Sequence, residues 1–185
     1  MEKFQNKYRI GSSRLKNWDY GKNASYFVTI CIRNRENLFG KIVDDRLILN
    51  ELGKIVEEIW LKIPEKFDFA KLENYVIMPN HLHGIITIEK NKEQIENDED
   101  LRKYFLNFEM GGFAKHKNPM LNINLSRIMK WFKGRVTFEI HKIHLDFQWQ
   151  DGFWDNIIKD EKMYFKIKNY ILNNPKNWKD DQFYF

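Results

Sequence analysis

The pattern of apolar and polar positions predicts that the chain forms strands near its N-terminus. Residues 25–32 (SYFVTICI) and 41–50 (KIVDDRLILN) are rich in the β-branched, aromatic and aliphatic side chains that favour strands. The polar stretch RNRENLFG between them is typical of a turn. The sequence therefore predicts that these two segments pair with each other as a hairpin.

A helix is predicted next. Between Leu52 and Ile63 the apolar residues recur at the spacing of one helix face, which indicates an amphipathic helix. Asn50 is a suitable N-cap, and Pro64 is expected to end the helix because proline cannot continue the backbone hydrogen bonding. We expect this helix to cover one face of a sheet.

Two further strands are predicted over residues 67–78 and 81–88, separated by the break at Pro79–Asn80. The following segment, residues 89–120, lacks periodicity. Its composition indicates a long insertion that contains one short helical piece around residues 101–108.

Helical periodicity returns over residues 125–140, with Asn124 as the candidate N-cap. A short aromatic segment, FQWQDGFWDNII, then leads into a last helix over residues 160–174, which Pro175 ends. The order of elements predicts a mixed fold of class α+β in one domain, residues 1–185.

Composition and charge limit the partners and the cellular compartment that we expect for the protein. The net charge is +5 and the sequence pI is about 9.1, which is compatible with a polyanionic partner but does not distinguish nucleic acid, an acidic membrane and a charge that serves solubility alone. The basic residues 1–23 are expected to form an arm over the core, or else a solvated tail. Cys31 is the single cysteine, so no intrachain disulfide can form. No apolar run suits a signal peptide or a membrane span, and we expect a cytoplasmic protein.

Two of the five histidines, His81 and His83, lie at the start of the predicted fourth strand, within YVIMPNHLHGIITI. Side chains alternate between the faces of a strand, so both imidazoles should project to one side while Leu82 points into the core. Two imidazoles on a rigid strand can hold a divalent metal and leave positions open for a third ligand, water and substrate. The bland alternative is a pair of half-buried polar residues on an edge strand. The other histidines, in loop or helix-end contexts, are weaker third-ligand candidates: His116, His141 and His144.

With its flanks, the pair resembles the signature of the HUH endonucleases, which is named for two histidines around a hydrophobic residue. The similarity is greatest to the single-tyrosine transposases related to the REP-associated tyrosine transposases. Three more blocks resemble that family in the same order: YFVTICIRNRENLFG, LSRIMKWFKGRVTFEI and WQDGFWDNIIKDEKMYFKIKNYILNNPKNW. The resemblance extends over residues 14–178 and excludes the 89–120 insertion.

This resemblance implies a ferredoxin-like HUH endonuclease fold, in which helices pack on one face of an antiparallel sheet and the histidine pair lies on a central strand. It also implies a chemistry. A tyrosine hydroxyl attacks a phosphate of single-stranded DNA and leaves a 5′-phosphotyrosine intermediate and a free 3′-OH, so strands can be rejoined without ATP. The implied partner is single-stranded or hairpin DNA, and the implied cofactor is Mg²⁺ or Mn²⁺.

The family motif maps the nucleophile to Tyr170, within NYILNNP, and the third metal ligand to Asn174. Residues i and i+4 are neighbours on one helix face, so a phenol and an amide there can meet one metal-bound phosphate. Many relatives have glutamine at the ligand position, which is one methylene longer, and Asn173 is the adjacent alternative. Lys166, on the same helix face, is a candidate to contact phosphate or to assist loss of the phenol proton, and is otherwise a solvated lysine.

A second stripe on the helix over residues 125–140 suggests a DNA-binding surface. Arg127, Trp131, Arg135 and Phe138 lie at helical spacing beside the apolar stripe. Arginine neutralises backbone charge, and aromatic rings stack on unpaired bases. The alternative is that Trp131 and Phe138 pack against the insertion or the N-terminal arm.

Two other functions are compatible with the sequence. The first is a domesticated family member that binds repetitive hairpin elements without cutting them. The second is a metal-dependent phosphoesterase that uses the histidine pair and has no need of Tyr170. A covalent DNA adduct distinguishes the transposase from the first, and turnover that survives Tyr170→Phe would support the second. The sequence also leaves open whether the chain acts as a monomer or as a homodimer.

Overall fold

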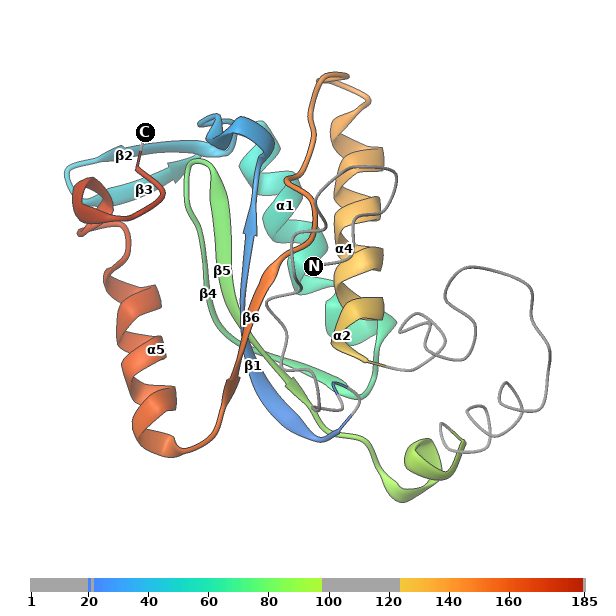
Figure 1. Ribbon diagram of the computed structural model, residues 1–185. Helices are drawn as coiled ribbons and strands as arrows, with labels where there is room; N and C mark the ends of the chain where they lie inside the picture. Colours follow the sequence, from blue (N-terminus) through green and yellow to red (C-terminus); the bar gives the residue numbers. More distant parts are fainter. Residues whose placement is uncertain (1–19, 21, 98–123, 185) are drawn as a thin grey trace, which may run out of the picture.

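A computed structural model describes residues 20, 22–97 and 124–184 (Figure 1). The predicted arm at residues 1–23 and the predicted insertion lie largely outside the described residues, and the helical piece expected at 101–108 lies wholly outside them. Residues 92–97, at the start of the insertion, form a short helix.

A sheet with the strand order β4-β5-β1-β6 forms the centre of the structure, and its neighbouring strands are all antiparallel. The strands are β1 (Ala24–Cys31), β4 (Ala70–Ile77), β5 (His81–Ile88) and β6 (Trp154–Ile158). Strand β5 lies between β1 and β4 in the sheet. Along the chain, helix α1 lies in the connection from β1 to β4. This arrangement is the split βαβ unit of ferredoxin-like folds. The predicted α+β class and the central position of the histidine strand are therefore confirmed.

The predicted pairing of the first two strand segments is wrong. The second segment folds on itself, as a hairpin of β2 (Gly40–Val43) and β3 (Arg46–Leu49). Its turn is formed by Asp44 and Asp45, whose φ angles of 48° and 59° lie in the left-handed region. Two consecutive residues with positive φ make the tight turn that suits the twist of a hairpin. Strand β1 pairs with β5 and β6 instead.

The main helices begin at the capping residues that the sequence indicates. They are α1 (Glu51–Leu61), α4 (Leu125–Ile140) and α5 (Glu161–Asn173), with the short helix α2 (Ile63–Lys66) after α1. The side chains of Asn50, Asn124 and Asp160 each accept a hydrogen bond from a backbone N–H of the first turn. Pro64 follows the end of α1 and lies in the first turn of α2, where its missing N–H costs no hydrogen bond. Within the described residues, no helix is both long and apolar enough to span a bilayer.

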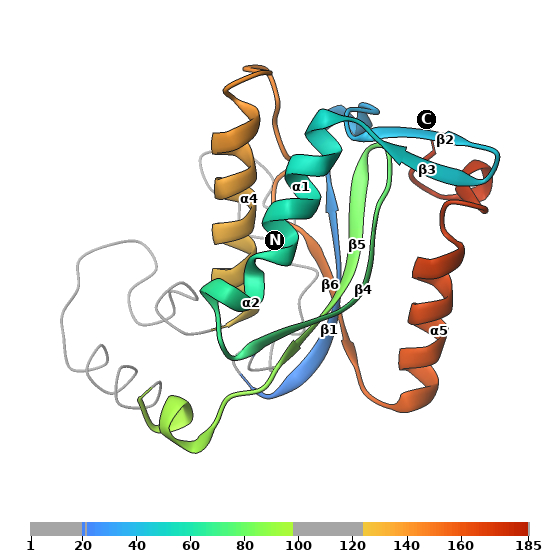
Figure 2. The same ribbon diagram turned by 180° about the vertical axis from the view of Figure 1, so that it is seen from behind.

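Helices cover both faces of the sheet, which corrects the expectation of helices on one face. Helices α1 and α4 lie on one side and α5 lies on the other (Figures 1 and 2). The first face buries Val28 and Leu82 with residues of α1 and α4. The second face buries Cys31 and Ile85 with Ile171 of α5. Apolar residues thus occupy both faces of the central strands, and each face needs its own cover.

The α1 face leaves no room for a side chain at Gly84. A Cβ atom there would lie 2.3 Å from Cζ2 of Trp60, which is fully buried. We expect Gly84→Ala to lower the free energy of unfolding by about 1–3 kcal/mol, because overpacking forces neighbouring atoms to shift. Gly134→Ala is the control, since a Cβ at that position in α4 has no neighbour within 4 Å. Urea unfolding tests both, and an unchanged midpoint for Gly84→Ala would contradict this packing.

Candidate active site

The side chains of His81 and His83 lie on the α5 side of β5, and Leu82 lies in the core on the other side, as strand alternation predicts. The two imidazoles are 0% and 1% exposed, and their ring centroids are 4.4 Å apart. The edge-strand alternative does not hold, because β5 is paired on both sides. The pair is a buried, rigidly held feature of the central sheet.

Hydrogen bonds around Asn80 fix the tautomer of His81. The side-chain amide of Asn80 donates from Nδ2 to the backbone carbonyls of Arg35, at 3.1 Å, and Phe183, at 2.8 Å. Its Oδ1 therefore faces Nδ1 of His81, at 2.8 Å, and accepts the hydrogen bond. This arrangement leaves the lone pair on Nε2 of His81.

Both histidines are electrically neutral at pH 7. Burial lowers the pKa of His81 to about 3, with a smaller contribution from the positive charge of Arg35. Burial, and then the neighbouring His81, lower the pKa of His83 well below its usual value. Nδ1 of His83 lies 2.8 Å from the hydroxyl of Thr29, which holds the ring in place. Neutral imidazole is the form that ligates metals.

Helix α5 brings Tyr170 and Asn174 to the histidines. The hydroxyl of Tyr170 is 3.1 Å from Nε2 of His83, although the two residues are 87 positions apart. Asn174 is the C-cap of α5 and is 2% exposed. The alternative ligand Asn173 is exposed, and its Nδ2 donates to the carbonyl of Asn169 at 2.8 Å. Of these two amides, Asn174 is thus the buried one, and its Nδ2 donates to Asp181, whose carboxylate lies close to both histidines.

Two buried polar atoms near the histidines have no hydrogen-bond partner among the described residues: Nε2 of His81 and Oδ1 of Asn174. Nearly all buried polar atoms in proteins are paired, so such exceptions call for an explanation such as a bound ion. Both atoms carry a lone pair, and imidazole nitrogen with amide oxygen is a donor set that divalent cations accept. The residues present therefore fit a divalent metal.

Asp181, which the sequence did not single out, completes the group. One ligand atom from each of His81, His83 and Asp181 lies within 4.8 Å of the others. Oδ2 of Asp181 accepts hydrogen bonds from Nδ2 of Asn174, at 2.8 Å, and from the hydroxyl of Tyr170, at 3.2 Å. No periodicity marks this residue. The only available signal was a carboxylate shortly after the NYILNNP motif.

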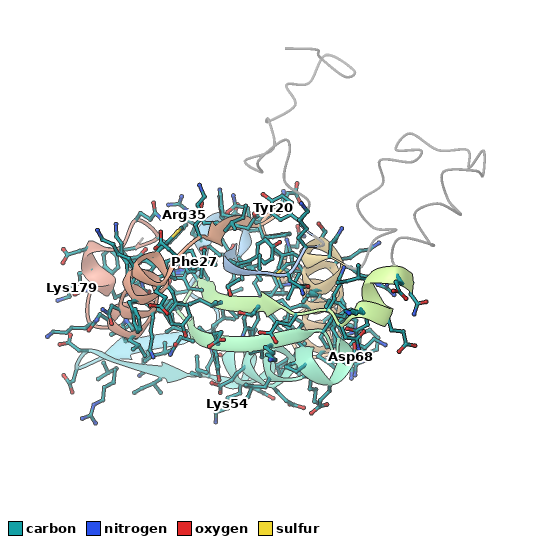
Figure 3. All side chains as sticks on the ribbon, turned by 90° about the horizontal axis from the view of Figure 1, so that it is seen from below. Tyr20, Phe27, Arg35, Lys54, Asp68 and Lys179 are labelled. Carbon is teal, nitrogen blue, oxygen red and sulfur yellow. The ribbon has the colours of Figure 1, made fainter. Side chains whose placement is uncertain are left out.

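The phenol of Tyr170 is the exposed member of the site, with 40% of the residue exposed. Partial burial raises its pKa above the usual value, and the neighbouring charge of Asp181 raises it further. The ring packs edge-on against Phe27, with centroids 6.1 Å apart, and Phe27 also stacks on His83. Figure 3 shows Phe27 and Arg35 on the α5 side of the molecule. Lys166, the candidate helper, is exposed on α5 one turn before Tyr170.

The DNA-binding candidates on α4 share one groove, away from the histidines. Arg127, Trp131, Arg135 and Phe138 line a groove of about 530 Å³. Trp131 also packs edge-on against Phe67 at 5.7 Å and is partly buried. Helix α4, which carries most of the residues that line the groove, lies on the other side of the sheet from α5 (Figure 2). The remaining lining residues are Lys66, Phe67, Lys130 and Gly134, so four cations and no carboxylate line it.

The other histidines do not join the site. His141 follows α4, and its Nε2 lies 2.9 Å from the carbonyl oxygen of Phe147. His144 lies in the loop that follows, and His116 is outside the described residues. Neither of the two described residues is a third ligand for the pair on β5.

Comparison with known proteins identifies a relative by sequence and a neighbour by structure. No family model matches the chain. A protein of Haemophilus influenzae described as uncharacterized is 38% identical over 185 residues, covering 96% of this chain and 97% of the relative. A REP-associated tyrosine transposase, solved bound to a REP hairpin, has a TM-score of 0.58 and 18% identity, covering 90% of this chain and 74% of its own. The chain therefore belongs to the same family as the H. influenzae protein, and its fold is that of a REP-associated tyrosine transposase.

Proposed function

We propose that the protein is a metal-dependent single-tyrosine HUH transposase, which cleaves and rejoins single-stranded DNA through a 5′-phosphotyrosine intermediate. The observation that carries the proposal is the meeting of Tyr170, Asn174 and the buried histidine pair at one point, from elements far apart in the sequence. A buried amide oxygen and a buried imidazole nitrogen without partners, beside an exposed phenol, are what this chemistry needs.

Tyr170 is proposed as the nucleophile. Its oxygen would attack the phosphorus of one phosphodiester, forming an oxygen–phosphorus bond while the bond to the 3′ oxygen breaks. The phosphate stays on the 5′ end of the downstream strand and is now joined to the tyrosine. The 3′ oxygen of the upstream strand leaves as a hydroxyl, so the proton lost by the phenol is balanced by the one that this oxygen takes up. The reverse reaction rejoins a 3′-OH to the phosphotyrosine, and no external energy source is needed because one phosphoester bond replaces another.

The metal would be held by His81, His83 and Asn174. A bound Mg²⁺ or Mn²⁺ supplies Lewis acidity toward a non-bridging phosphate oxygen. Without metal, the phenol hydroxyl lies within hydrogen-bond distance of Nε2 of His83 and Oδ2 of Asp181, and it can donate its one proton to either of them. Burial of the histidines keeps them neutral, so their lone pairs are available without a proton being displaced first.

The substrate is proposed to be single-stranded or hairpin DNA. The solved structural neighbour is a transposase bound to a REP hairpin. The net charge of +5 and the basic groove on α4 are compatible with a DNA partner. The test is incubation with a single-stranded hairpin oligonucleotide and Mn²⁺, followed by a denaturing gel. A protein–DNA adduct that survives denaturation supports the proposal, and hairpin binding with no adduct favours the domesticated binding protein.

We expect the double substitution Arg127→Ala with Arg135→Ala to weaken oligonucleotide binding and to reduce its salt dependence. Each lost phosphate contact lowers the slope of log affinity against log salt by about 0.7–0.9. The two guanidinium groups line the same groove with Trp131 between them on the helix. Fluorescence anisotropy at several salt concentrations measures both quantities.

A matched control is Arg46→Ala with Lys54→Ala. It removes the same charge from exposed positions on β3 and α1, which do not line the groove. If both double variants lose affinity equally, binding depends on net charge alone and the groove is not a DNA site.

A further inference from the structure

The carboxylate of Asp181 is partly buried and lies close to the two histidines. Asp181 follows the short 3₁₀ helix η3 (Trp178–Asp180), and the chain there folds back over the histidine side of the sheet. Its carboxylate lies within 4.8 Å of one nitrogen from each of His81 and His83. Phe183, two residues later, packs against the ring of His81 with centroids 4.6 Å apart.

Three hydrogen bonds hold the carboxylate in this place. Oδ1 accepts from the backbone N–H of Phe183 at 2.7 Å. Oδ2 accepts from Nδ2 of Asn174 at 2.8 Å and from the hydroxyl of Tyr170 at 3.2 Å. An ionised carboxylate has about four acceptor positions, so the group retains capacity for another partner. None of the ion pairs among the described residues includes Asp181.

The bond from Asn174 also orients that amide. Because Nδ2 of Asn174 donates to Asp181, Oδ1 is the atom left in the buried interior without a partner. The carboxylate of Asp181 is therefore hydrogen-bonded to the amide of Asn174 and lies close to two neutral imidazoles. A partly buried negative charge next to uncharged ligands favours a cation there.

We infer that Asp181 is a fourth protein ligand of the metal, in addition to His81, His83 and Asn174. This inference rests on the metal site of the proposed function and extends it. Two oxygen and two nitrogen ligands suit Mg²⁺ or Mn²⁺ better than two imidazoles and one amide, because a carboxylate is a hard ligand with negative charge. A six-coordinate ion with four protein ligands keeps two positions for water or phosphate oxygens.

The same assignment affects Tyr170. The two atoms that lie within hydrogen-bond distance of its hydroxyl, Nε2 of His83 and Oδ2 of Asp181, both belong to metal-ligating groups. Their use as ligands would end both of these contacts of the phenol hydroxyl. Metal loading would then free the hydroxyl for a phosphate, and the nucleophile would be held by the protein until the metal is present.

The test is Mn²⁺ binding to the full chain without DNA, measured from the free Mn²⁺ signal in electron paramagnetic resonance. We expect Asp181→Asn to weaken Mn²⁺ affinity at least about tenfold, because the loss of a residue that only hydrogen-bonds to a ligand already weakens metal binding by roughly that factor. Asp181→Glu keeps a carboxylate and should retain more affinity than Asp181→Asn. Asp180→Asn is the control, because it removes the same charge from the adjacent exposed residue. Thermal melts report whether each variant is folded.

The outcomes separate this inference from the function on which it rests. Asp181→Asn affinity equal to that of the unaltered chain, with binding lost in His81→Ala plus His83→Ala, would overturn the role of Asp181 and leave the metal site standing. An unaltered chain that binds no Mn²⁺ would overturn both. Weakened Mn²⁺ binding in Asp181→Asn, with no DNA cleavage by the unaltered chain, would support the ligand and contradict the transposase.

Discussion

Tyr170→Phe is expected to abolish the covalent DNA adduct while leaving the fold and DNA binding intact. Phenylalanine keeps the edge-on packing against Phe27 and removes only the hydroxyl, which lies 3.1 Å from Nε2 of His83. Loss of a covalent nucleophile typically costs far more than about 1000-fold in rate. A labelled hairpin oligonucleotide with Mn²⁺, resolved on a denaturing gel, measures the adduct directly.

Tyr164→Phe is the matched control for this experiment. Tyr164 lies on the same helix, and its hydroxyl donates to Glu73 at 3.1 Å, outside the group around the histidines. The control should form the adduct at the rate of the unaltered chain. An adduct of undiminished yield with Tyr170→Phe would show that Tyr170 is not the nucleophile. Turnover of small phosphodiesters by that variant would favour the phosphoesterase.

The second large effect is expected from His81→Ala combined with His83→Ala. This variant removes both imidazole ligands, and metal-dependent cleavage should fall by more than the roughly 10- to 100-fold that loss of one outer hydrogen bond costs in metal sites. DNA binding in the absence of metal should change little, because the basic groove is lined mainly by α4, which lies on the other side of the sheet from α5. Cleavage and anisotropy assays measure the two quantities separately.

A control with the same composition is His141→Ala combined with His144→Ala. These histidines follow α4, away from the site, and their loss should leave Mn²⁺-dependent cleavage unchanged. Thermal melts of both double variants check folding, because His81 and His83 are buried and their removal takes away the hydrogen-bond partner of Oδ1 of Asn80 and that of the Thr29 hydroxyl. Full cleavage by the His81 and His83 variant would rule out a histidine-held metal.

Much of the fold follows from local patterns in the sequence. Asn50, Asn124 and Asp160 cap helices where the apolar stripes begin, because a short polar side chain there satisfies a backbone N–H that the helix leaves unpaired. Strand alternation predicts that His81 and His83 share a face. These features depend on residues close together in the chain, so they can be worked out before any tertiary contact is known.

The errors in the sequence interpretation have tertiary causes. The Asp44–Asp45 pair adopts positive φ angles and turns the second segment back on itself, and no apolar pattern distinguishes this turn from a continuous strand. The aromatic segment before α5 contains β6, which pairs with β1 at the edge of the sheet. The partner of an edge strand lies far away in the sequence, and the segment alone does not identify it.

The candidate site shows the same division. Spacing alone could not select Tyr170 among eight tyrosines, and the family resemblance supplied it. Asp181 escaped notice because it reaches the histidines only when the C-terminal segment folds back over β5, which three hydrogen bonds and ring contacts with Phe183 stabilise. Such a contact has no periodicity, and only the folded structure brings it to attention.

Identification of the residue that carries the DNA tests the central claim most directly. After reaction with a single-stranded hairpin oligonucleotide and Mn²⁺, the protein is digested with nuclease and trypsin and analysed by mass spectrometry. Cleavage after Lys168 and Lys176 releases the peptide NYILNNPK, whose only tyrosine is Tyr170. If Tyr170 is the nucleophile, this peptide carries a nucleotide linked through phosphate to Tyr170. A nucleotide attached to any other residue, or a cleaved strand with no linked peptide, would contradict it.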